Sequence, residues 1–566
     1  MSIYAERPWL SSYAEGVPAD IDLPAGSLSH LIDESVAVYG KHVALEFFGA
    51  TTTYAELGEQ IARVAEGLRK RGVRKGDRVA LVLPNCPQHV VAFYAVLRLG
   101  AVVVEHNPLY TPRELRHQFE DHGAQVAIVW DKVAKTVQDL PADLGVTTVV
   151  AIDITRAMPG SKRVALRLPV PAARRARDQL TAKAPGTIAW ETLLSSRRLK
   201  ASSPRPERDD LALIQYTSGT TGVPKGAMLS HLNLTVNAAQ SRAWVPAIAR
   251  GSSVVYAVLP LFHAYGLTLC LTFAMSMGAR LVLFPKFDPD LVLDVVKKRP
   301  PTFLPAVPPI YERLVTAAET RKVSLSGIQI AISGAMSLPE SIVRLWEGKT
   351  GGYLVEGYGL SECSPVLMAN PVGSTRKDGT VGLPLSNTEL RVVDPDDPSV
   401  DRAFGEEGEL LARGPQVFSG YWRKTDETAK VFTDDGWFRT GDIVTMDEDG
   451  FVRIVDRIKE LIVTGGFNVA PTEVEDALRA FEGVADVAVV GLPHARGGED
   501  VVAAVVMQPG ASFDEAAIRA FARDGLTPYK VPKHVYAVDE LPRSIVGKVI
   551  RRKVRDQLLA ATADIA

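Results

Sequence analysis

The chain has 566 residues, 46% of them hydrophobic and 23% charged, with a formal net charge of −2. This length exceeds one compact core, so several domains are expected. The near-neutral charge argues against a general nucleic-acid binder, which would carry a large basic excess, so we expect no nucleic-acid partner. The three cysteines, Cys86, Cys270 and Cys363, lie far apart. They indicate neither a disulfide framework nor a zinc site, which fits a reducing, cytoplasmic setting.

The first part of the chain alternates helix-like and strand-like segments. Apolar residues recur at helical spacing over 54–71 and 90–99, while 78–83 and 101–104 are short apolar runs typical of strands. Residues 111–114 predict a helix start. Thr111 can cap the helix, Pro112 suits its first position and Glu114 can close a capping box. The alternation predicts an α/β fold with layered, mostly parallel sheets. Residues 1–10 contain no apolar core, so no signal peptide is expected.

Basic residues dominate the segment 161–183. They are Lys162, Arg163, Arg167, Arg174, Arg175, Arg177 and Lys183, against one acid, Asp178. Its prolines disfavour one long helix. One interpretation is a solvated surface insertion. The other is a peripheral contact with anionic lipid at the inner face of the cell membrane, where each basic residue contributes ~1 kcal/mol.

A loop rich in glycine and hydroxyl groups follows the strand-like run 211–215. Its glycines let the backbone approach a ligand closely, and its hydroxyl and N–H groups can cradle phosphate oxygens. The residues expected to hold phosphate are Thr217, Ser218, Gly219, Thr220, Thr221, Gly222 and Lys225. It is not a P-loop, because Pro224 precedes Lys225 and Gly226 follows it. A flexible Ser/Thr/Gly loop is the alternative.

The stretch 251–279 contains no Asp, Glu, Lys or Arg. Pro260, His263 and Gly266 interrupt it, and the remainder is too short to cross ~30 Å of hydrocarbon. We predict a buried strand, a loop and a buried helix. Its lack of a carboxylate favours an uncharged, apolar substrate tail, because a buried ammonium group without a partner is very costly.

These segments resemble the signature motifs of the adenylate-forming superfamily, which comprises acyl-CoA synthetases, adenylation domains of peptide synthetases and luciferases. The matches follow the family's order along nearly the whole chain: 216–226, 259–266, 332–336, 356–362, 435–442, 464–469 and 541–548. The sequence is most similar to bacterial long-chain-fatty-acid–CoA ligases, including over 107–115. The resemblance implies a fatty-acid substrate with ATP, Mg²⁺ and coenzyme A.

The resemblance also implies a role for each matched residue. Lys548, Glu362, Ser361 and His263 would be catalytic, and Glu362 and Thr217 would bind Mg²⁺. Beyond the phosphate loop, the nucleotide and coenzyme A would be held by Gly334, Ala335, Glu356, Gly357, Tyr358, Gly359, Asp442, Arg457, Gly465 and Gly466. The family usually has threonine where this chain has Ser361. The family also often has other residues where this chain has Phe438, Arg439 and Ile458. These differences leave the chain length of the substrate open.

A change in composition near 455–459 predicts a domain boundary at Asp456. Residues 1–455 would form a large ATP- and acyl-binding domain of several subdomains. Residues 456–566 would form a small α+β lid, with strands at 485–490 and 501–507 and helices at 473–481 and 514–523. A lysine and a thiol tunnel cannot occupy the same face at once. The resemblance therefore implies a mobile lid that rotates about a hinge near Asp456.

The expected reaction is activation of a medium- or long-chain fatty acid to acyl-AMP, followed by transfer to coenzyme A. The alternatives are an aryl- or small-acid–CoA ligase, a stand-alone adenylation domain that loads a carrier protein, and a non-catalytic ATP- or acyl-lipid-binding module. The combination of Lys225, Glu362, Asp442 and Lys548 argues against the last. Only residues 549–566 follow Lys548, so no fused carrier domain is expected. A homodimer is a further hypothesis.

Overall fold

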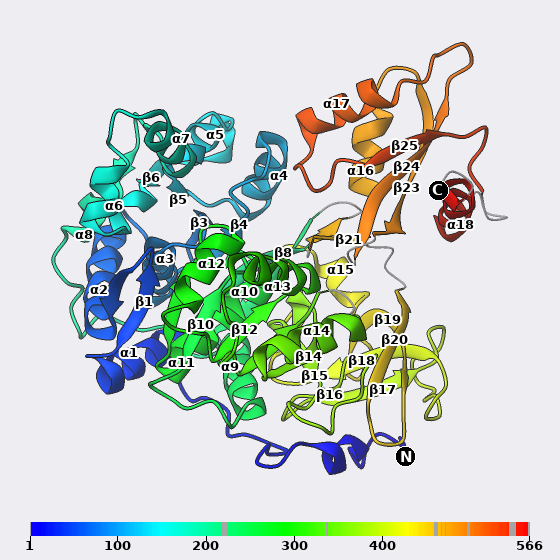
Figure 1. The fold of residues 1–566 in the computed structure, drawn as a ribbon, viewed down its shortest axis with the longest axis horizontal. Coiled ribbons are helices and arrows are strands. Elements are labelled where there is room, and N and C mark those ends of the chain that lie inside the picture. Colours follow the sequence, from blue (N-terminus) through cyan, green and yellow to red (C-terminus); the bar gives the residue numbers. More distant parts are fainter. Residues whose placement is uncertain are drawn as a thin grey trace.

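The computed structural model describes residues 2–217, 224–335, 338–457, 462–465, 467–469, 471–494, 498–542, 549 and 551–563, without the side chains at 455–457, 468, 472, 552 and 562–563. Within these residues the strands form five sheets. Sheets of seven, nine and four strands belong to the first part of the chain, and sheets of two and three strands to the last part, drawn in orange and red in Figure 1.

Strands that are neighbours in a sheet are often distant in the chain. From one edge to the other, the seven-stranded sheet contains β7 (Ile188–Ala189), β6 (Thr148–Ile152), β5 (Val126–Trp130), β3 (Arg78–Val82), β4 (Val102–His106), β8 (Leu211–Thr217) and β9 (Lys225–Ser230). The nine-stranded sheet contains β16 (Leu383–Pro384), β15 (Val366–Ala369), β14 (Tyr353–Gly359), β13 (Ile330–Ser333), β12 (Phe303–Ala306), β10 (Val254–Ala257), β11 (Arg280–Leu283), β1 (Val43–Phe47) and β2 (Ala50–Thr53). The smaller sheets contain β17 (Glu389–Val393), β18 (Gly408–Arg413), β19 (Phe438–Met446) and β20 (Val452–Arg457); β21 (Ile462–Thr464) and β22 (Phe467–Val469); and β23 (Val484–Pro493), β24 (Glu499–Met507) and β25 (His534–Ala537).

The helices follow in chain order. They are α1 (Leu28–Tyr39), α2 (Tyr54–Lys70), α3 (Pro87–Arg98), α4 (Pro112–His122), α5 (Ala134–Gln138), α6 (Gly160–Ala165), α7 (Pro171–Leu180), α8 (Trp190–Leu194), α9 (His231–Trp244), α10 (Ala264–Gly266), α11 (Phe273–Met277), α12 (Pro289–Val296), α13 (Pro308–Arg321), α14 (Glu340–Thr350), α15 (Thr425–Ala429), α16 (Pro471–Arg479), α17 (Glu515–Gly525) and α18 (Arg551–Ala563).

The two largest sheets are parallel at their centres. The nine-stranded sheet has antiparallel strands at both edges, and the seven-stranded sheet has one at the β9 edge alone. β6, β5, β3, β4 and β8 run parallel, and β9 closes the edge antiparallel to β8. Helix α3 is buried along its whole length and packs against strands of both sheets, so it lies between them. Helices α4 and α5 cover the outer face of the seven-stranded sheet through a separate apolar cluster. Parallel strands covered on both faces explain the continuous apolar runs in the sequence. The predicted layered α/β architecture is confirmed.

Several local predictions are also confirmed. At α4 the Thr111 hydroxyl oxygen accepts from the Glu114 amide, and the Glu114 carboxylate accepts from the Thr111 amide at 2.8 Å, which is the predicted capping box. The charge-free stretch forms β10, a loop and a buried helical run that ends in α11. Residues Leu267–Thr272 of that run form a π-helical turn, η5, which the sequence pattern did not indicate. Among the described helices, none has the length and apolar character needed to cross a membrane.

The last part of the chain has its own apolar cores. β23, β24 and β25 carry α16 and α17 on one face, while α18 packs on the other face. The core of this domain starts with Ile462, whereas β20 still pairs with β19 of the first part through Asp456 and Arg457. The described change of domain therefore falls between 457 and 462, and the hinge at Asp456 stays a prediction.

Candidate functional site

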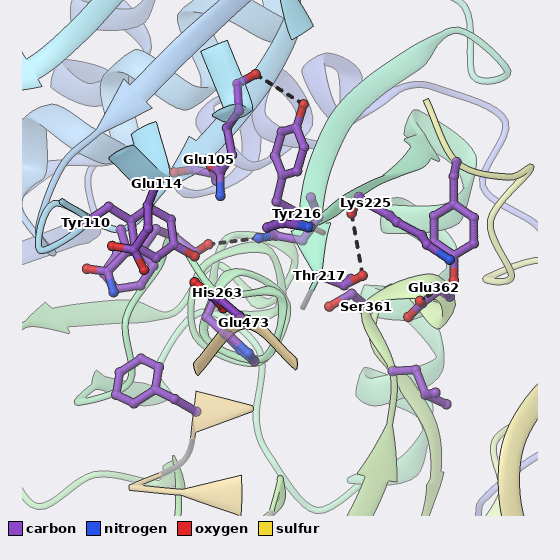
Figure 2. Close-up of a pocket in the computed structure, with 18 of the residues that line it drawn as sticks. Glu105, Tyr110, Glu114, Tyr216, Thr217, Lys225, His263, Ser361, Glu362 and Glu473 are labelled. Atoms are coloured by element: carbon purple, nitrogen blue, oxygen red, sulfur yellow. Dashed lines mark hydrogen bonds between the residues drawn. The ribbon is translucent and has the colours of Figure 1, made fainter. Parts of the chain in front are cut away.

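A pocket lies where strands of three sheets meet and the C-terminal domain approaches them (Figure 2). β8 contributes Thr217, β14 contributes Gly359 and β19 contributes Asp442. The full lining consists of Glu105, Asn107, Tyr110, Glu114, Gln118, Gln215, Tyr216, Thr217, Pro224, Lys225, Phe262, His263, Gly359, Leu360, Ser361, Glu362, Tyr421, Val431, Asp442, Phe467, Glu473, Tyr529 and Lys530. The pocket thus collects residues from four of the predicted motifs that precede residue 456.

Lys225 stands in a chain of polar contacts on one wall of the pocket. Its ammonium group forms an ion pair with Glu427 and lies 5.3 Å from the ring centre of Tyr421. The Tyr421 hydroxyl donates to Glu362 Oε1 at 2.7 Å. Hydrogen bonds from Lys225 and Lys430 lower the pKa of Glu427 to about 2, so this carboxylate is charged at neutral pH. Lys225 and Glu362 are therefore linked, with the charge of Lys225 balanced by Glu427.

Asp442 and Tyr358 join the nine-stranded sheet to the four-stranded sheet. The Tyr358 hydroxyl donates to Asp442 Oδ2, and both residues are buried. Gly359 follows at a place where a Cβ atom would lie 1.9 Å from the Pro365 carbonyl oxygen, so only glycine fits there. The two predicted nucleotide motifs are thus in direct contact.

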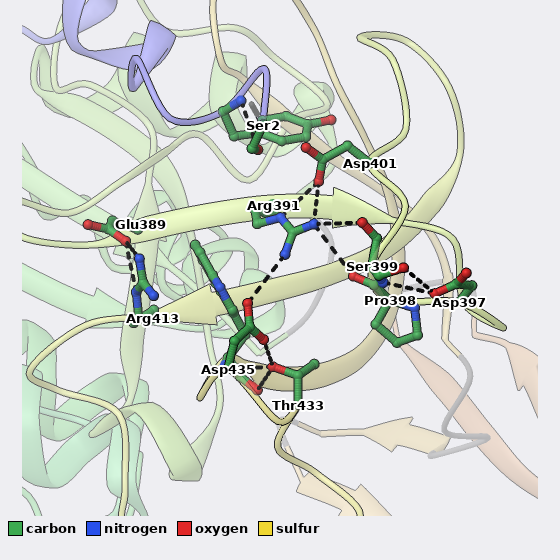
Figure 3. A network of polar contacts seen from close by, with 12 residues as sticks. Ser2, Glu389, Arg391, Asp397, Pro398, Ser399, Asp401, Arg413, Thr433 and Asp435 are labelled. Atoms are coloured by element: carbon green, nitrogen blue, oxygen red, sulfur yellow. Dashed lines mark hydrogen bonds and ion pairs between the residues drawn. The ribbon is translucent and has the colours of Figure 1, made fainter.

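A polar network fixes the turn that leads into β19. Figure 3 shows Arg391 between two carboxylates, with Nη2 2.7 Å from Asp401 Oδ1 and Nη1 3.9 Å from Asp435 Oδ2. The guanidinium of Arg413 lies 4.3 Å from the ring centre of Trp437. These contacts hold residues 435–437 and thereby set the start of the strand that carries Asp442.

His263 lines the pocket at the entrance to α10. Its Nδ1 accepts from the Tyr265 amide at 3.3 Å, and burial lowers the pKa of the ring to about 4. The neighbouring Phe262 carbonyl accepts from Gln215 Nε2 at 3.1 Å, which ties this loop to β8. Asn85 holds the start of the same loop, since its side-chain oxygen accepts from the Leu261 amide at 2.8 Å. The imidazole is therefore neutral at pH 7, and its loop is held by Gln215 of β8 and by Asn85, which follows β3 of the same sheet.

Gly334 and Ala335 directly follow β13, and Glu356 and Gly357 lie within its partner β14; none of these four predicted residues lines the pocket. A Cβ atom on Gly334 would come within 3.2 Å of the Tyr265 ring, and Ala335 has a left-handed φ of 65°. Burial raises the pKa of Glu356 to about 8, so its carboxyl group is mostly protonated at pH 7. At this edge the backbone of Gly334 is packed closely against Tyr265, and the carboxyl group of Glu356 is largely uncharged.

The C-terminal domain supplies the opposite side of the pocket. Phe467, from the short hairpin that also contains Gly465, lines the pocket and stacks on Tyr529 with ring centres 4.3 Å apart. Several predicted residues lie outside the described part of the chain: Ser218, Gly219, Thr220, Thr221, Gly222, Gly466, Lys548 and the side chain of Arg457. Their roles stay predictions.

Sequence reasoning missed several residues in or beside the pocket. Tyr421 and Glu427 contact Glu362 and Lys225 from far along the chain, and no local pattern marks them. Glu114 was predicted only as a helix cap, although it also faces the pocket. The remaining lining residues that were not among the predicted site residues are Glu105, Asn107, Tyr110, Gln118, Gln215, Tyr216, Pro224, Phe262, Leu360, Val431, Phe467, Glu473, Tyr529 and Lys530.

Comparisons with known proteins agree with this geometry. The family model described as AMP-binding enzyme matches residues 32–422, and that of the AMP-binding enzyme C-terminal domain matches 473–548. A long-chain-fatty-acid–CoA ligase of Bacillus subtilis is 37% identical over 98% of this chain and 98% of its own length. A feruloyl-CoA synthase of Amycolatopsis is 34% identical over 90% of this chain and 95% of its own length.

A solved structure extends the comparison to three dimensions. The amide bond synthetase McbA from Marinactinospora thermotolerans is 26% identical and covers 94% of this chain and 99% of its own, with a TM-score of 0.79. The resemblance to the adenylate-forming superfamily noted in the sequence is confirmed.

The neutral state of His263 predicts how stability varies with pH. The pKa of imidazole is about 6.5 in an unfolded chain, against about 4 in this fold. Between pH 6.5 and pH 4 the unfolded state therefore binds more protons at this histidine than the folded state does. The contribution of neutral His263 to the free energy of unfolding is complete above about pH 6.5 and is lost as the pH falls toward 4. His263→Gln should reduce the loss of unfolding free energy between pH 7 and pH 5 by about 2 kcal/mol, measured by urea denaturation. His42→Gln, which removes an exposed imidazole, is the control. An unchanged loss in His263→Gln would contradict this prediction.

Proposed function

The chain belongs to the AMP-binding enzyme family, and from this membership we propose that it activates a medium- or long-chain fatty acid with ATP and transfers the acyl group to coenzyme A. In the first step a carboxylate oxygen attacks the α-phosphorus of ATP, giving acyl-AMP and pyrophosphate. In the second step the thiol of coenzyme A attacks the acyl carbon and AMP leaves. The observation that carries the proposal is the full-length similarity to long-chain-fatty-acid–CoA ligases.

The described polar groups suit the first step, in which catalysis consists mainly of positioning and charge stabilisation. Lys225 would pair with the phosphates of ATP in place of Glu427, its present partner. Asp442 would accept the ribose hydroxyls, and Tyr358, already bonded to it, would lie along the adenine. Each role follows from the chemistry of a side chain in or beside one pocket.

Mg²⁺ suits the donors on the same wall. Glu362 is a buried carboxylate that lines the pocket, and Thr217 adds a hydroxyl at the end of β8. Mg²⁺ prefers such hard oxygen ligands and completes its shell with phosphate oxygens and water. When bound, the ion would offset the negative charge of the phosphates. Ser361, next to Glu362, would donate a hydrogen bond to the α-phosphate or to the carboxylate of the substrate.

The acyl group would enter beside His263. This neutral ring would contact the carboxylate or the adenylate, and Phe262, Leu360 and Val431 supply apolar lining. The helical run that ends in α11 is buried and lacks charged residues, which favours an apolar tail. An aromatic acid is the second candidate, favoured by the similarity to a feruloyl-CoA synthase.

The C-terminal residues would act in turn. We assign Lys548 to the first step, where its charge would bridge the carboxylate and the α-phosphate. Gly465, Gly466 and Phe467 would line the path of the coenzyme A thiol in the second step. Arg457 would assist at the ribose, and residues 456–566 would rotate as a lid about Asp456.

Turnover across a series of acids tests this function. Pyrophosphate release is measured with ATP, Mg²⁺ and acids from acetate to oleate, with and without coenzyme A. Each methylene group buried in the acyl pocket contributes about 0.8 kcal/mol. The kcat/KM should therefore rise about fourfold per methylene group until the tail fills the pocket.

Three other outcomes would contradict the proposal. Activity with ferulate but with no fatty acid would favour an aryl–CoA ligase. Pyrophosphate release without acyl-CoA would favour a carrier-protein acceptor. No pyrophosphate release with any acid would favour a binding module.

A second proposal concerns α6 and α7. Neither helix buries a residue, and Val164, Leu168 and Val170 are 63%, 50% and 45% exposed. Exposed cations surround them, including Arg163, Arg167, Arg174 and Arg175. Cations beside exposed apolar side chains are typical of a surface that binds anionic lipid. We propose that this segment contacts the membrane surface from which an apolar substrate would arrive.

Vesicle sedimentation tests the lipid contact. Arg174, Arg175 and Arg177 are replaced by Gln, and binding to vesicles with anionic lipid is compared with the wild type. At ~1 kcal/mol per charge, affinity should fall by about 100-fold. Lys286, Lys297 and Lys298, which are exposed elsewhere, are replaced by Gln as the matched control. Equal losses in both triple variants, or none in the first, would contradict the proposal.

A further inference from the structure

A group of three charges joins α4 to the C-terminal domain. Lys530 Nζ lies 2.7 Å from Glu114 Oε1 and 2.8 Å from Glu473 Oε1. Glu114 belongs to α4, while Lys530 and Glu473 belong to the C-terminal domain. The side chains of Lys530, Glu114 and Glu473 are only 6%, 8% and 16% exposed. Three charges are therefore nearly dry at the point where the two domains meet.

Glu114 uses its two oxygens for two different contacts. Oε2 closes the capping box of α4, accepting from the Thr111 amide at 2.8 Å and from its hydroxyl at 2.9 Å. Oε1 faces the other domain and accepts from Lys530 and, at 3.4 Å, from the Thr527 hydroxyl. The cap holds the carboxylate rigid, so Lys530 meets a fixed partner only when the domains are docked in this way.

The opposite charges of Lys530 and Glu114 favour this docked arrangement. Burial alone lowers the pKa of Lys530, but the carboxylates of Glu473 and Glu114, together with Tyr529 and Tyr110, outweigh it and hold the pKa above its usual value. The ammonium group therefore stays charged. Loss of Lys530 would leave two buried carboxylates without a counter-charge, whereas loss of Glu114 would leave Lys530 paired with Glu473 of its own domain and remove the attraction between the domains.

The same contact brings the C-terminal hairpin to the pocket. Tyr529, adjacent to Lys530, stacks on Phe467, and the ammonium of Lys530 lies 5.4 Å from the ring centre of Tyr110. Tyr110, Glu114, Phe467, Glu473, Tyr529 and Lys530 all line the pocket that contains His263. Figure 2 shows Tyr110, Glu114 and Glu473 on the same side as His263. The charged group thus connects domain docking to the placement of Phe467.

We propose that Lys530, clamped between Glu114 and Glu473, is a positioning residue that holds the C-terminal domain in the arrangement used for acyl transfer to the thiol. This inference rests on the proposed two-step function. The Glu114–Lys530 pair crosses the domain boundary, so it must break when the C-terminal domain rotates. This docked arrangement places Phe467, which we assigned to the thiol path, in the pocket, so the pair favours the second step and has no part in the first.

Glu114→Gln separates the two roles of this residue. Glutamine can still close a capping box, so α4 keeps its start while the charge facing Lys530 is lost. Acyl-AMP formation is measured without coenzyme A, and acyl transfer is measured from acyl-AMP formed in advance. The variant should slow acyl transfer about tenfold and change acyl-AMP formation by less than about twofold.

Two further variants isolate the interdomain contact. Glu56 makes the same capping box on α2, with Oε2 2.8 Å from the Thr53 amide, so Glu56→Gln is the matched control and should alter neither step. Lys530→Met should slow acyl transfer as Glu114→Gln does, and the double variant should be no slower than Lys530→Met. Equal slowing of both steps, or additive losses in the double variant, would overturn the proposal.

A distance measurement reports on docking without reference to activity. The three native cysteines are buried, so spin labels can be placed selectively at Glu120→Cys and Asp524→Cys, both at exposed positions. Glu114→Gln should broaden the label-to-label distance distribution, while Glu56→Gln should not. An unchanged distribution in Glu114→Gln would overturn the positioning role. If the wild type forms no acyl-AMP from any acid, the proposed function fails, whereas these distances still report on the contact.

Discussion

Side-chain hydrogen bonds between separate sheets create the pocket on which the proposed chemistry depends. Tyr358 on β14 donates to Asp442 on β19, which fixes the nine-stranded sheet against the four-stranded one. Gln215 on β8 donates to the Phe262 carbonyl, which fixes the loop of His263 to the seven-stranded sheet. Parallel strands deliver their ends to the crevice between sheets, where ligands of α/β folds commonly bind. Together with the apolar core shared by these sheets, the two cross-links fix the relative positions of the predicted motifs.

The charges at the pocket are balanced by protein partners in the described structure. Lys225 pairs with Glu427 on one side, and Lys530 pairs with Glu114 and Glu473 on the other. An anionic substrate would compete with Glu427 for Lys225. Binding of the substrate would therefore break the ion pair between Lys225 and Glu427. Lys530 stays surrounded by carboxylates, which suits a docking contact better than a phosphate site. The two lysines thus have different electrostatic surroundings and, we infer, different roles.

Local chemistry made part of the molecule predictable. The capping box at Thr111 and Glu114 depends only on residues three apart, and the sequence was sufficient for it. Likewise, the apolar run at 211–215 became β8, and the charge-free stretch became a buried strand and helix. The prolines at 161–183 disfavoured one long helix, and the segment forms two short helices, α6 and α7. In contrast, Tyr421, Glu427 and Lys530 reach the site through contacts between distant segments, and no periodicity or motif encodes such a contact.

The most direct test of the central claim is a comparison of the two half-reactions in Lys548→Ala. The wild type should form acyl-AMP from ATP and a long-chain fatty acid such as palmitate without coenzyme A, detected by chromatography. The variant should lose this step by about 100-fold or more, as expected when a group that stabilises developing charge is removed. It should still convert acyl-AMP and coenzyme A to acyl-CoA at nearly the wild-type rate. Equal loss of both steps, or the absence of acyl-AMP in the wild type, would contradict the proposed mechanism.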